Sequence, residues 1–448
     1  MAIVLARNRV SPARWAAFEI LRKVEDGVFS SVLLARESQL EPSDQALCHE
    51  LVLGVLRWQL NLDKVIEHYS NRSIETLDKS VLIALRLGLY QLRFLTRVPA
   101  SAAVDESVKL VQAARLSSAR TFVNAVLRRA TREPLYDPAA DLSDPIDGLS
   151  VSTSHPRWLI ERWIESFGLE ETSSFTRANN QTPRMAFRVV RTRANQSEVL
   201  ARLSAAGAVL ESSDVAQGAL KVSGMSPVMR GLAARGEIYL QDEASQLVAE
   251  IVDARDGERV LDLCAAPGGK ATMISDRADN ALVVASDVSL RRLMAVARTI
   301  AVQQLRRISL LVLDAATALP FLNDSFDRVL VDAPCSGTGT LRHNPEIRWR
   351  LAVEDIGRLV SQQHQFLLNA SKVVKVGGRL VYSTCSVEKE ENEDVVEQFL
   401  HSQKNFRQIP LRTGSILATP SGALRTWPHR DGTDGFFVAV LEKSQSPF

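Results

Sequence analysis

At 448 residues the chain is too long for one hydrophobic core of ordinary size, so two or three domains are expected. The composition, with 46% hydrophobic and 24% charged residues, is typical of a globular protein, and no apolar stretch reaches the roughly 20 residues of a membrane-spanning helix. The net charge of +2 does not by itself indicate nucleic-acid binding, although residues 1–135 hold 19 Lys and Arg against 14 Asp and Glu.

The first 135 residues predict an all-α domain. The apolar run at residues 1–7 is too short for a signal peptide, which favours a cytoplasmic protein. Ser11 and Pro12 form an N-cap followed by proline at the first helical position, and apolar residues then recur at helical spacing. Further helices are predicted from residue 43 and over 80–95, 101–114 and 118–129.

The middle of the chain predicts a linker and a small subdomain. Residues 134–156 contain four Asp, four Pro and no Lys or Arg, which indicates an extended connection. We assign this linker to residues 136–156. Residues 157–235 then predict a small α/β subdomain of the RRM-like kind. Its expected elements are helices over 157–167 and 196–206 and strands over 185–191 and 219–222.

From residue 236 to 448, strands and helices alternate regularly. This alternation predicts a doubly wound, mainly parallel sheet, whose ligands bind beyond the carboxyl ends of the strands. The predicted strands cover 259–264, 282–287, 308–314, 326–332, 378–385 and 436–441, and the predicted helices cover 268–277, a stretch from 289, and 353–374.

The first of these strands runs into a glycine-rich turn with the sequence Leu-Asp-Leu-Cys-Ala-Ala-Pro-Gly-Gly-Lys (261–270). Neither G-x-G-x-x-G nor a Walker A loop is present, and Asp262 would repel a pyrophosphate. A carboxylate at this point suits S-adenosylmethionine, which carries an ammonium and a sulfonium. Asp287 is expected to accept hydrogen bonds from ribose hydroxyls, and Asp314 to lie on the adenine side. The alternative is a tight turn with incidental acidic residues.

Two of the four cysteines follow neighbouring strands. Cys335 lies in Asp-Ala-Pro-Cys-Ser-Gly-Thr-Gly (332–339) and Cys385 in Ser-Thr-Cys-Ser (383–386). Adjacent strand ends lie about 5 Å apart, so the two thiols are expected to converge. Cys48 and Cys264 are interpreted as packing residues, and without a Cys-x-x-Cys pair no metal site is predicted.

Converging thiols suit methylation of a pyrimidine carbon. Carbon 5 of cytosine is a poor nucleophile until a thiolate adds to carbon 6, and a group at N3 stabilises the adduct. Asp332 could supply that group if it is protonated, and Lys270 would favour a thiolate. Inert packing and a regulatory disulfide are the alternatives, whereas the Asp/Asn-Pro-Pro-aromatic loop of adenine N6 methyltransferases is absent.

These motifs, together with Gln-Asp-Glu-Ala-Ser (241–245) and Asp-Gly-Phe-Phe (434–437), resemble the NOL1/NOP2/Sun family of RNA cytosine-5 methyltransferases. The helical front resembles NusB, an RNA-binding module, most closely at Phe-Val-Asn-Ala-Val-Leu-Arg-Arg (122–129). The resemblance implies a Rossmann-like class I S-adenosylmethionine-dependent methyltransferase domain behind a NusB-like bundle, with a cytosine of 16S rRNA as target.

The resemblance also implies individual roles. In this family the thiol corresponding to Cys385 is the nucleophile and the one corresponding to Cys335 assists product release, with Asp332 and Lys270 beside them. From the residues alone, Cys335 would be chosen as the nucleophile. The implied cofactor contacts are Cys264, Ala265, Ala266, Pro267, Gly268, Gly269, Lys270, Asp287, Asp314 and Asp332.

The segment after the Pro-Cys loop is basic. Two interpretations are open for its basic and aromatic residues: they bind RNA phosphates and stack on a base, or they form a solvated loop and helix start. These residues are Arg342, His343, Arg348, Trp349 and Arg350. The expected partner is RNA, without DNA, membrane or metal, and the protein is expected to be a monomer. Two other functions remain open, a tRNA cytosine-5 methyltransferase and a non-catalytic assembly factor.

Overall fold

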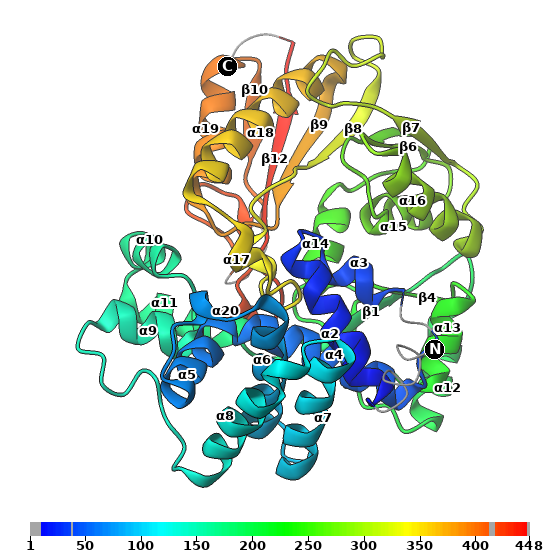
Figure 1. Ribbon diagram of the computed structural model, residues 1–448. Helices are drawn as coiled ribbons and strands as arrows, with labels where there is room; N and C mark the ends of the chain where they lie inside the picture. The colour runs from blue at the N-terminus through cyan, green and yellow to red at the C-terminus, as the bar shows by residue number, and fades with distance from the viewer. Residues whose placement is uncertain (1–9, 37–38, 412–416, 446–448) are drawn as a thin grey trace. The chain divides into compact units, whose positions relative to one another are not determined.

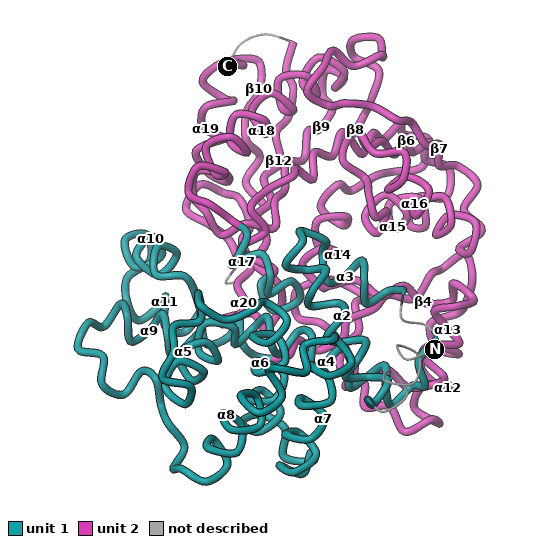
Figure 2. The backbone as a smooth tube through the Cα atoms, in the orientation of Figure 1, with its two compact units in different colours: residues 1–181, 341–350 teal, residues 182–340, 351–448 magenta. Residues whose placement is uncertain are grey.

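The computed structural model describes residues 10–36, 39–411 and 417–445, so the apolar run at 1–7 lies outside the described residues. The chain divides into two compact units, shown in Figures 1 and 2. The helical unit comprises residues 1–181 and 341–350, and the sheet unit comprises 182–340 and 351–448. Over the described ranges, no helix is long and apolar enough to cross a bilayer.

The helical unit confirms the predicted all-α front. Its α-helices are α2 (Pro12–Glu25), α3 (Ser30–Leu34), α4 (Pro42–Arg57), α5 (Gln59–Ser70), α6 (Lys79–Phe94), α7 (Ala100–Ala113), α8 (Arg120–Arg132), α9 (Pro145–Thr153), α10 (Arg157–Phe167), α11 (Leu169–Asn179) and α17 (Ile347–Arg350). The predicted cap at Ser11 is present, since its side chain accepts a hydrogen bond from the N–H of Arg14. A buried bidentate pair of Arg86 with Asp63, at 2.7 and 2.8 Å, joins α6 to α5.

The segment predicted as a linker contains a helix. Asp144 caps α9 by accepting from the N–H of Ile146 at 2.9 Å, Pro145 occupies the first turn, and Leu149 and Val151 are buried. Two of the four prolines of this segment therefore lie at helix starts, Pro145 in the first turn of α9 and Pro156 as the N-cap of α10, because proline is tolerated there. The helix predicted at 157–167 is present as α10, which lies with α11 in the helical unit.

The basic segment 341–350 is packed inside the helical unit, as its colour in Figure 2 shows. The Arg348 guanidinium is 1% exposed, and its Nη1 donates to the carbonyl of Ser154 and to Oδ1 of Asn180, both at 3.0 Å. Glu346 Oε1 accepts from the N–H and the hydroxyl of Ser30 at 2.9 and 2.7 Å. Nη1 of Arg348 is thus bonded to protein acceptors, while Nε and Nη2 are buried without a hydrogen-bond partner among the described residues. This burial favours neither a phosphate grip nor a solvated loop.

The small α/β part of the sheet unit is a four-stranded antiparallel sheet in the order β2-β3-β1-β4. One cluster of buried apolar side chains, including Phe187, Leu203 and Leu232, joins this sheet to its two helices. The elements are β1 (Met185–Val189), α12 (Gln196–Ala205), β2 (Leu210–Ser212), β3 (Leu220–Val222), α13 (Pro227–Ala234) and β4 (Ile238–Leu240).

The large sheet has the order β10-β12-β9-β8-β5-β6-β7, with β11 paired to β12. The neighbours from β9 to β7 are all parallel, which confirms the predicted mainly parallel sheet, and β12 is antiparallel to β9 and β10. The strands are β5 (Arg259–Asp262), β6 (Leu282–Asp287), β7 (Ile308–Val312), β8 (Phe326–Asp332), β9 (Val374–Thr384), β10 (Phe406–Ile409), β11 (Leu424–Arg425) and β12 (Phe437–Lys443).

Helices cover both faces of this sheet, because its central strands are apolar on both sides. Alternate residues such as Val260 and Val381 pack with α14 and α15, and their neighbours Leu261 and Leu380 pack with α18 and α19. The helices are α14 (Glu243–Ile251), α15 (Gly269–Arg277), α16 (Leu290–Gln303), α18 (Val353–Val373), α19 (Glu393–Ser402) and α20 (Pro428–Asp431).

Candidate active site

The glycine-rich turn after β5 leads directly into α15, as predicted. Gly268 has a φ of +108°, and a Cβ added there would lie 2.9 Å from Val296. A Cβ on Gly269 would lie 3.2 Å from the side chains of Gln241 and Tyr239. The N–H of Ala265 donates to the carbonyl of Ser286 at 2.8 Å, which ties the turn to β6. Both glycines are therefore required for the backbone to run this close to its neighbours.

Asp262, at the end of β5, is a buried carboxylate that the protein leaves largely without hydrogen bonds. It is 1% exposed, and neither of its oxygens accepts a hydrogen bond of normal geometry from the residues that the structure describes. Burial, assisted by the charge of Asp332, raises the pKa of Asp262 to about 7 against the opposing charge of Lys270. Such a group is costly in the folded protein unless a cation or donor completes it.

The other two strand-end aspartates differ from Asp262 in their partners. Asp287 is buried, its Oδ1 accepts from the N–H of Ser289 at 2.9 Å, and its Oδ2 lies 3.3 Å from Nη2 of Arg292. Asp314 follows β7, is exposed, and accepts from the N–H of Ala316 at 2.9 Å. The N–H of Leu313 donates to the carbonyl of Asp287 at 3.2 Å, so the two aspartates follow adjacent strands.

Lys270 and Asp332 form an ion pair between the start of α15 and the end of β8. Nζ of Lys270 lies 2.7 Å from Oδ2 of Asp332, and the Ser383 hydroxyl donates to Oδ1 at 2.6 Å. Burial alone would lower the pKa of Lys270, but the charge and hydrogen bond of Asp332, with the charge of Cys385, raise it. Because both of its oxygens accept hydrogen bonds, Asp332 is bound as a carboxylate. This geometry does not favour the protonated Asp332 that the predicted role as a proton donor to N3 requires.

The predicted convergence of the two thiols is confirmed. Sγ of Cys335 lies 3.3 Å from Sγ of Cys385, well beyond the roughly 2 Å of a disulfide bond, and the N–H of Cys385 points at Sγ of Cys335 at 3.3 Å. The contact with Cys385, burial, and the charges of Cys385 and Glu391 raise the pKa of the Cys335 thiol.

The other two cysteines lie apart from this contact. Cys48 is buried in the core of the helical unit, as expected for a packing residue. Burial and the nearby carboxylates, Asp262 foremost, raise the pKa of the Cys264 thiol, which packs beside the glycine turn.

A buried glutamate joins the two cysteine loops. Glu391 is 0% exposed, and its Oε2 accepts from the hydroxyls of Ser336 and Ser386, both at 2.5 Å. Its Oε1 accepts from the N–H of Ser336 and from Nε2 of Gln363, both at 2.9 Å. Glu391 was not predicted as a site residue, because it lies in the acidic run 388–394, whose composition is typical of a solvated surface.

Backbone contacts bring a third motif to the same place. The N–H of Gly339 donates to the carbonyl of Cys385 at 2.9 Å, and the N–H of Gly435 donates to the carbonyl of Gly339 at 2.8 Å. A Cβ on Gly339 would lie 1.9 Å from the Gly435 oxygen. Next to Gly435, the ring of Phe436 lies 5.0 Å from Nζ of Lys270. The Asp-Gly-Phe-Phe motif is therefore part of the site.

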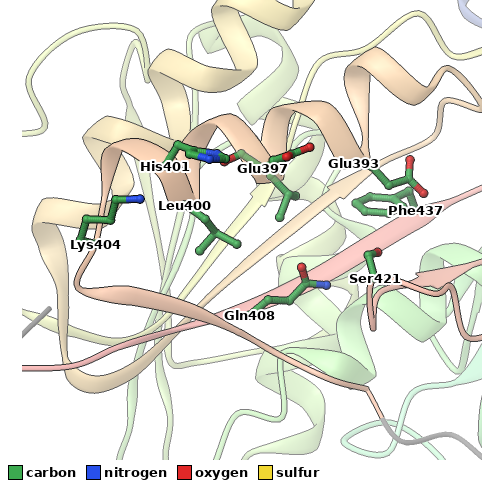
Figure 3. A pocket seen from close by; sticks show the side chains of 9 residues that line it. Glu393, Glu397, Leu400, His401, Lys404, Gln408, Ser421 and Phe437 are labelled. Atoms are coloured by element: carbon green, nitrogen blue, oxygen red, sulfur yellow. The ribbon is translucent and has the colours of Figure 1, made fainter. Parts of the chain in front are cut away.

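Figure 3 shows a separate cavity of about 400 Å³ between α19 and the strands β10 and β12. Its lining includes Glu397, His401 and Gln408, together with Phe437 of the Asp-Gly-Phe-Phe motif, but none of the predicted catalytic and cofactor-contact residues. The strand ends, rather than this cavity, bring the predicted side chains together.

Three family models match separate parts of the chain. The model described as 16S rRNA methyltransferase RsmB/F matches residues 249–442, that of the NusB family matches 11–132, and that of the RsmF/B-like ferredoxin-like domain matches 155–229. The probable ribosomal RNA small subunit methyltransferase B of Bacillus subtilis is 33% identical over 442 residues, which are 95% of this chain and 98% of the relative. The corresponding protein of Pseudomonas putida is 35% identical over 436 residues, with 96% and 98% covered.

The chain belongs to the 16S rRNA methyltransferase RsmB/F family.

Two solved structures are also similar to this RsmB/F family member in sequence and fold. The crystal structure of PH0851 has 28% identity and a TM-score of 0.83, and the match covers 97% of this chain and 99% of the other. A methyltransferase homolog from Pyrococcus horikoshii has 25% identity and a TM-score of 0.58, with 67% and 100% covered.

S-adenosylmethionine is the cofactor of this RsmB/F family member, and the strand-end residues fit it. The unpartnered carboxylate of Asp262 suits an ammonium group, and Asp287 is placed to receive hydroxyl donors. The turn at Gly268 and Gly269 leaves no Cβ in the way of a ligand that lies against the backbone.

Proposed function

We propose that the protein methylates carbon 5 of a cytosine in 16S rRNA, and that a cysteine thiolate adds to the base during the reaction. The observation that carries this proposal is the contact of two thiols, 3.3 Å apart, beside the Lys270–Asp332 pair at the strand ends. An enzyme that methylates an exposed nitrogen or oxygen has no use for a pair of free sulfurs, whereas carbon 5 needs one to add and release.

In this proposal Cys385 is the nucleophile, as the family resemblance implies. Its sulfur bonds to carbon 6, the electrons of the 5,6 double bond move into the ring, and the proton of the Cys385 thiol passes to N3. The positive charge of Lys270 favours the anionic sulfur. Asp332, held as a carboxylate by Lys270 and Ser383, then accepts a hydrogen bond from the protonated N3.

Bound S-adenosylmethionine supplies the electrophilic methyl group. Asp262 and Asp287 are proposed to hold it in position. The remaining proposed contacts are Cys264, Ala265, Ala266, Pro267, Gly268, Gly269, Lys270, Asp314 and Asp332. In release, the carbon-5 proton passes to solvent water, its bonding electrons re-form the 5,6 double bond, and the bond between carbon 6 and sulfur breaks with its electrons on Cys385. Cys335, in contact with the departing sulfur, bears a proton that it can pass to the leaving thiolate. N3 returns its proton to solvent, and Cys335 regains from solvent the proton that it gives up.

The division of labour between the domains is part of the proposal. Residues 236–448 carry out the chemistry, and the NusB-like helices supply contacts to the rRNA backbone, which position the substrate without specifying its sequence. The names of the curated relatives support 16S rRNA over tRNA. A non-catalytic role would leave the unpartnered Asp262 and the paired thiols without a use.

The test is a methylation assay with labelled S-adenosylmethionine and protein-free 16S rRNA or tRNA, followed by nucleoside analysis. Label in 5-methylcytidine from 16S rRNA supports the proposal, and label in another nucleoside or in neither RNA contradicts it. Cys385→Ala is expected to abolish transfer while cofactor binding survives. Cys335→Ala is expected to accumulate a covalent protein–RNA complex, because addition proceeds while release stalls. Normal turnover of either variant would contradict its assigned role.

A further inference from the structure

Two thiols in contact raise the question of which one attacks, since both lie within reach of one substrate. Their loops are built alike: each cysteine is followed by a serine, Ser336 or Ser386, whose hydroxyl donates to Oε2 of Glu391 at 2.5 Å. The backbone N–H of Ser336 donates to Oε1 of the same carboxylate at 2.9 Å. One buried charge is therefore shared by both loops.

We propose that Glu391 is a positioning residue that fixes the spacing of the two cysteine loops and keeps Cys335 as a thiol, so that Cys385 is the sulfur that adds to the base. This inference rests on the proposed function. It concerns a residue outside the cysteine, lysine and aspartate set from which that function was argued.

The surrounding charges differ at the two sulfurs. The charge of Glu391 disfavours an anion on Cys335, in addition to the effects of the Cys385 contact and of burial. On the other side, Cys385 interacts with the ammonium of Lys270, whose pKa is lowered by burial and raised by Asp332 and, after it, by Cys385. The remaining titratable neighbour is Tyr382, whose hydroxyl donates to the Glu391 carbonyl at 2.5 Å and whose pKa is raised by burial and by Cys335.

The geometry also fixes how rigidly Glu391 is held. Nε2 of Gln363 on α18 donates both to its Oε1 and to the carbonyl of Pro334, each at 2.9 Å. The following residue, Asn392, accepts from the Thr384 hydroxyl at 2.5 Å and donates to the Ser386 carbonyl at 2.9 Å. Every polar group of the carboxylate is satisfied, so its charge cannot turn toward the other sulfur without breaking several buried hydrogen bonds.

This network permits a substitution that removes the charge and keeps the packing. In Glu391→Gln, the amide oxygen can face the N–H groups of Ser336 and Gln363, which can only donate. The amide nitrogen can face the two serine hydroxyls, which can rotate and accept. Glu397→Gln is the matched control, since Glu397 is an exposed glutamate of α19 that lines the cavity in Figure 3 and has no part in the network.

The first measurement is the rate of alkylation of each cysteine by iodoacetamide between about pH 6 and 10, resolved by peptide mass spectrometry. Glu391→Gln is expected to lower the midpoint for Cys335 by about one pH unit or more, since a buried like charge is removed. Glu397→Gln is expected to match the unmodified protein. An unchanged midpoint for Cys335 in folded Glu391→Gln overturns the proposal.

The second measurement is the sulfur that becomes linked to RNA containing 5-fluorocytidine, which blocks loss of the carbon-5 substituent and traps the adduct. The unmodified protein and Glu397→Gln are expected to carry the link on Cys385, and Glu391→Gln on both cysteines. Exclusive linkage to Cys385 in folded Glu391→Gln overturns the selection of the sulfur by Glu391.

Two results remain decisive if the variant fails to fold or the proposed function is wrong. In the unmodified protein, Cys335 is expected to be alkylated later than Cys385 as the pH rises, and the reverse order overturns the inference. If the unmodified protein forms neither 5-methylcytidine nor an adduct, the proposed function fails, and the alkylation midpoints alone then decide whether Glu391 holds Cys335 as a thiol.

Discussion

Asp262 and Glu391 are two carboxylates of the same unit, 1% and 0% exposed, with opposite surroundings. Asp262 accepts no hydrogen bond of normal geometry from the described residues and has only a weak interaction with the N–H of Cys264, whereas the two oxygens of Glu391 accept four hydrogen bonds. Burial of an unsatisfied carboxylate opposes folding, and burial of a fully bonded one does not. The comparison separates a carboxylate that needs a ligand as its hydrogen-bonding partner from one whose partners all come from the protein.

The largest expected effect is that of Asp262→Asn on cofactor binding. Loss of the charge that faces the ammonium should weaken S-adenosylmethionine binding by about 100-fold or more, because removing one partner of a buried ion pair costs about 3 kcal/mol. The thermal midpoint of the apo protein at pH 8 should not fall, since the charge has no partner there. Isothermal titration calorimetry and differential scanning calorimetry measure the two quantities. If Asp262→Asn bound S-adenosylmethionine as tightly as the unmodified protein, or if apo Asp262→Asn were less stable than the unmodified apo protein, the distinction between the two carboxylates would be wrong.

Glu391→Ala should show the opposite pattern. Its removal leaves the N–H of Ser336, the Gln363 amide and two hydroxyls without their acceptor, so the free energy of unfolding should fall by about 3 kcal/mol. The affinity of the folded protein for S-adenosylmethionine should change less than about threefold. Denaturant unfolding with and without cofactor gives both numbers, and Glu397→Ala serves as the exposed control.

The smallest expected effect is on the pH dependence of binding. With a pKa of about 7 for Asp262, against 3.8 for an ordinary aspartate, the apo folded state retains this proton where the unfolded state has lost it. The contribution of Asp262 to the free energy of unfolding of the apo protein is therefore fully present below about pH 4 and is lost as the pH rises through 7. Binding of an ammonium needs the ionised form, so affinity should rise by up to about tenfold per pH unit between about pH 5.5 and 7. A flat profile, or the same slope in Asp262→Asn, would contradict the assignment.

The strand ends could be predicted from the sequence because their signals are local. Apolar strands followed by acidic, glycine or cysteine residues placed Asp262, Asp287, Cys335 and Cys385 at one edge of a parallel sheet. Adjacency of β8 and β9 then fixed the contact of the two sulfurs, which the structure has at 3.3 Å. The choice of the nucleophile could not be predicted in this way, since it depends on charges that differ over a few ångströms.

What could not be predicted depends on partners far away in the chain. Glu391 meets Ser336 across 55 residues, and Arg348 meets Ser154 across 194, so no local pattern separates them from exposed charged residues. The helix α9 is different, because Asp144 and Pro145 form a recognisable start that the number of prolines obscured. The short strands β2, β4 and β11, of three, three and two residues, were not predicted, whereas β3, also of three residues, was predicted at 219–222, so a strand this short gives an unreliable pattern.

The strand β12 lies between β9 and β10, although it follows both in the sequence (Figure 1). During synthesis the edge of β9, which leads to Cys385, therefore has no neighbour on that side until residues 437–443 have left the ribosome. Gly435, which holds the Pro-Cys loop through Gly339, emerges just before them. A nascent chain that stops before residue 435 is therefore expected to lack two supports of the cysteine loops, the pairing of β12 with β9 and the contact of Gly435 with Gly339.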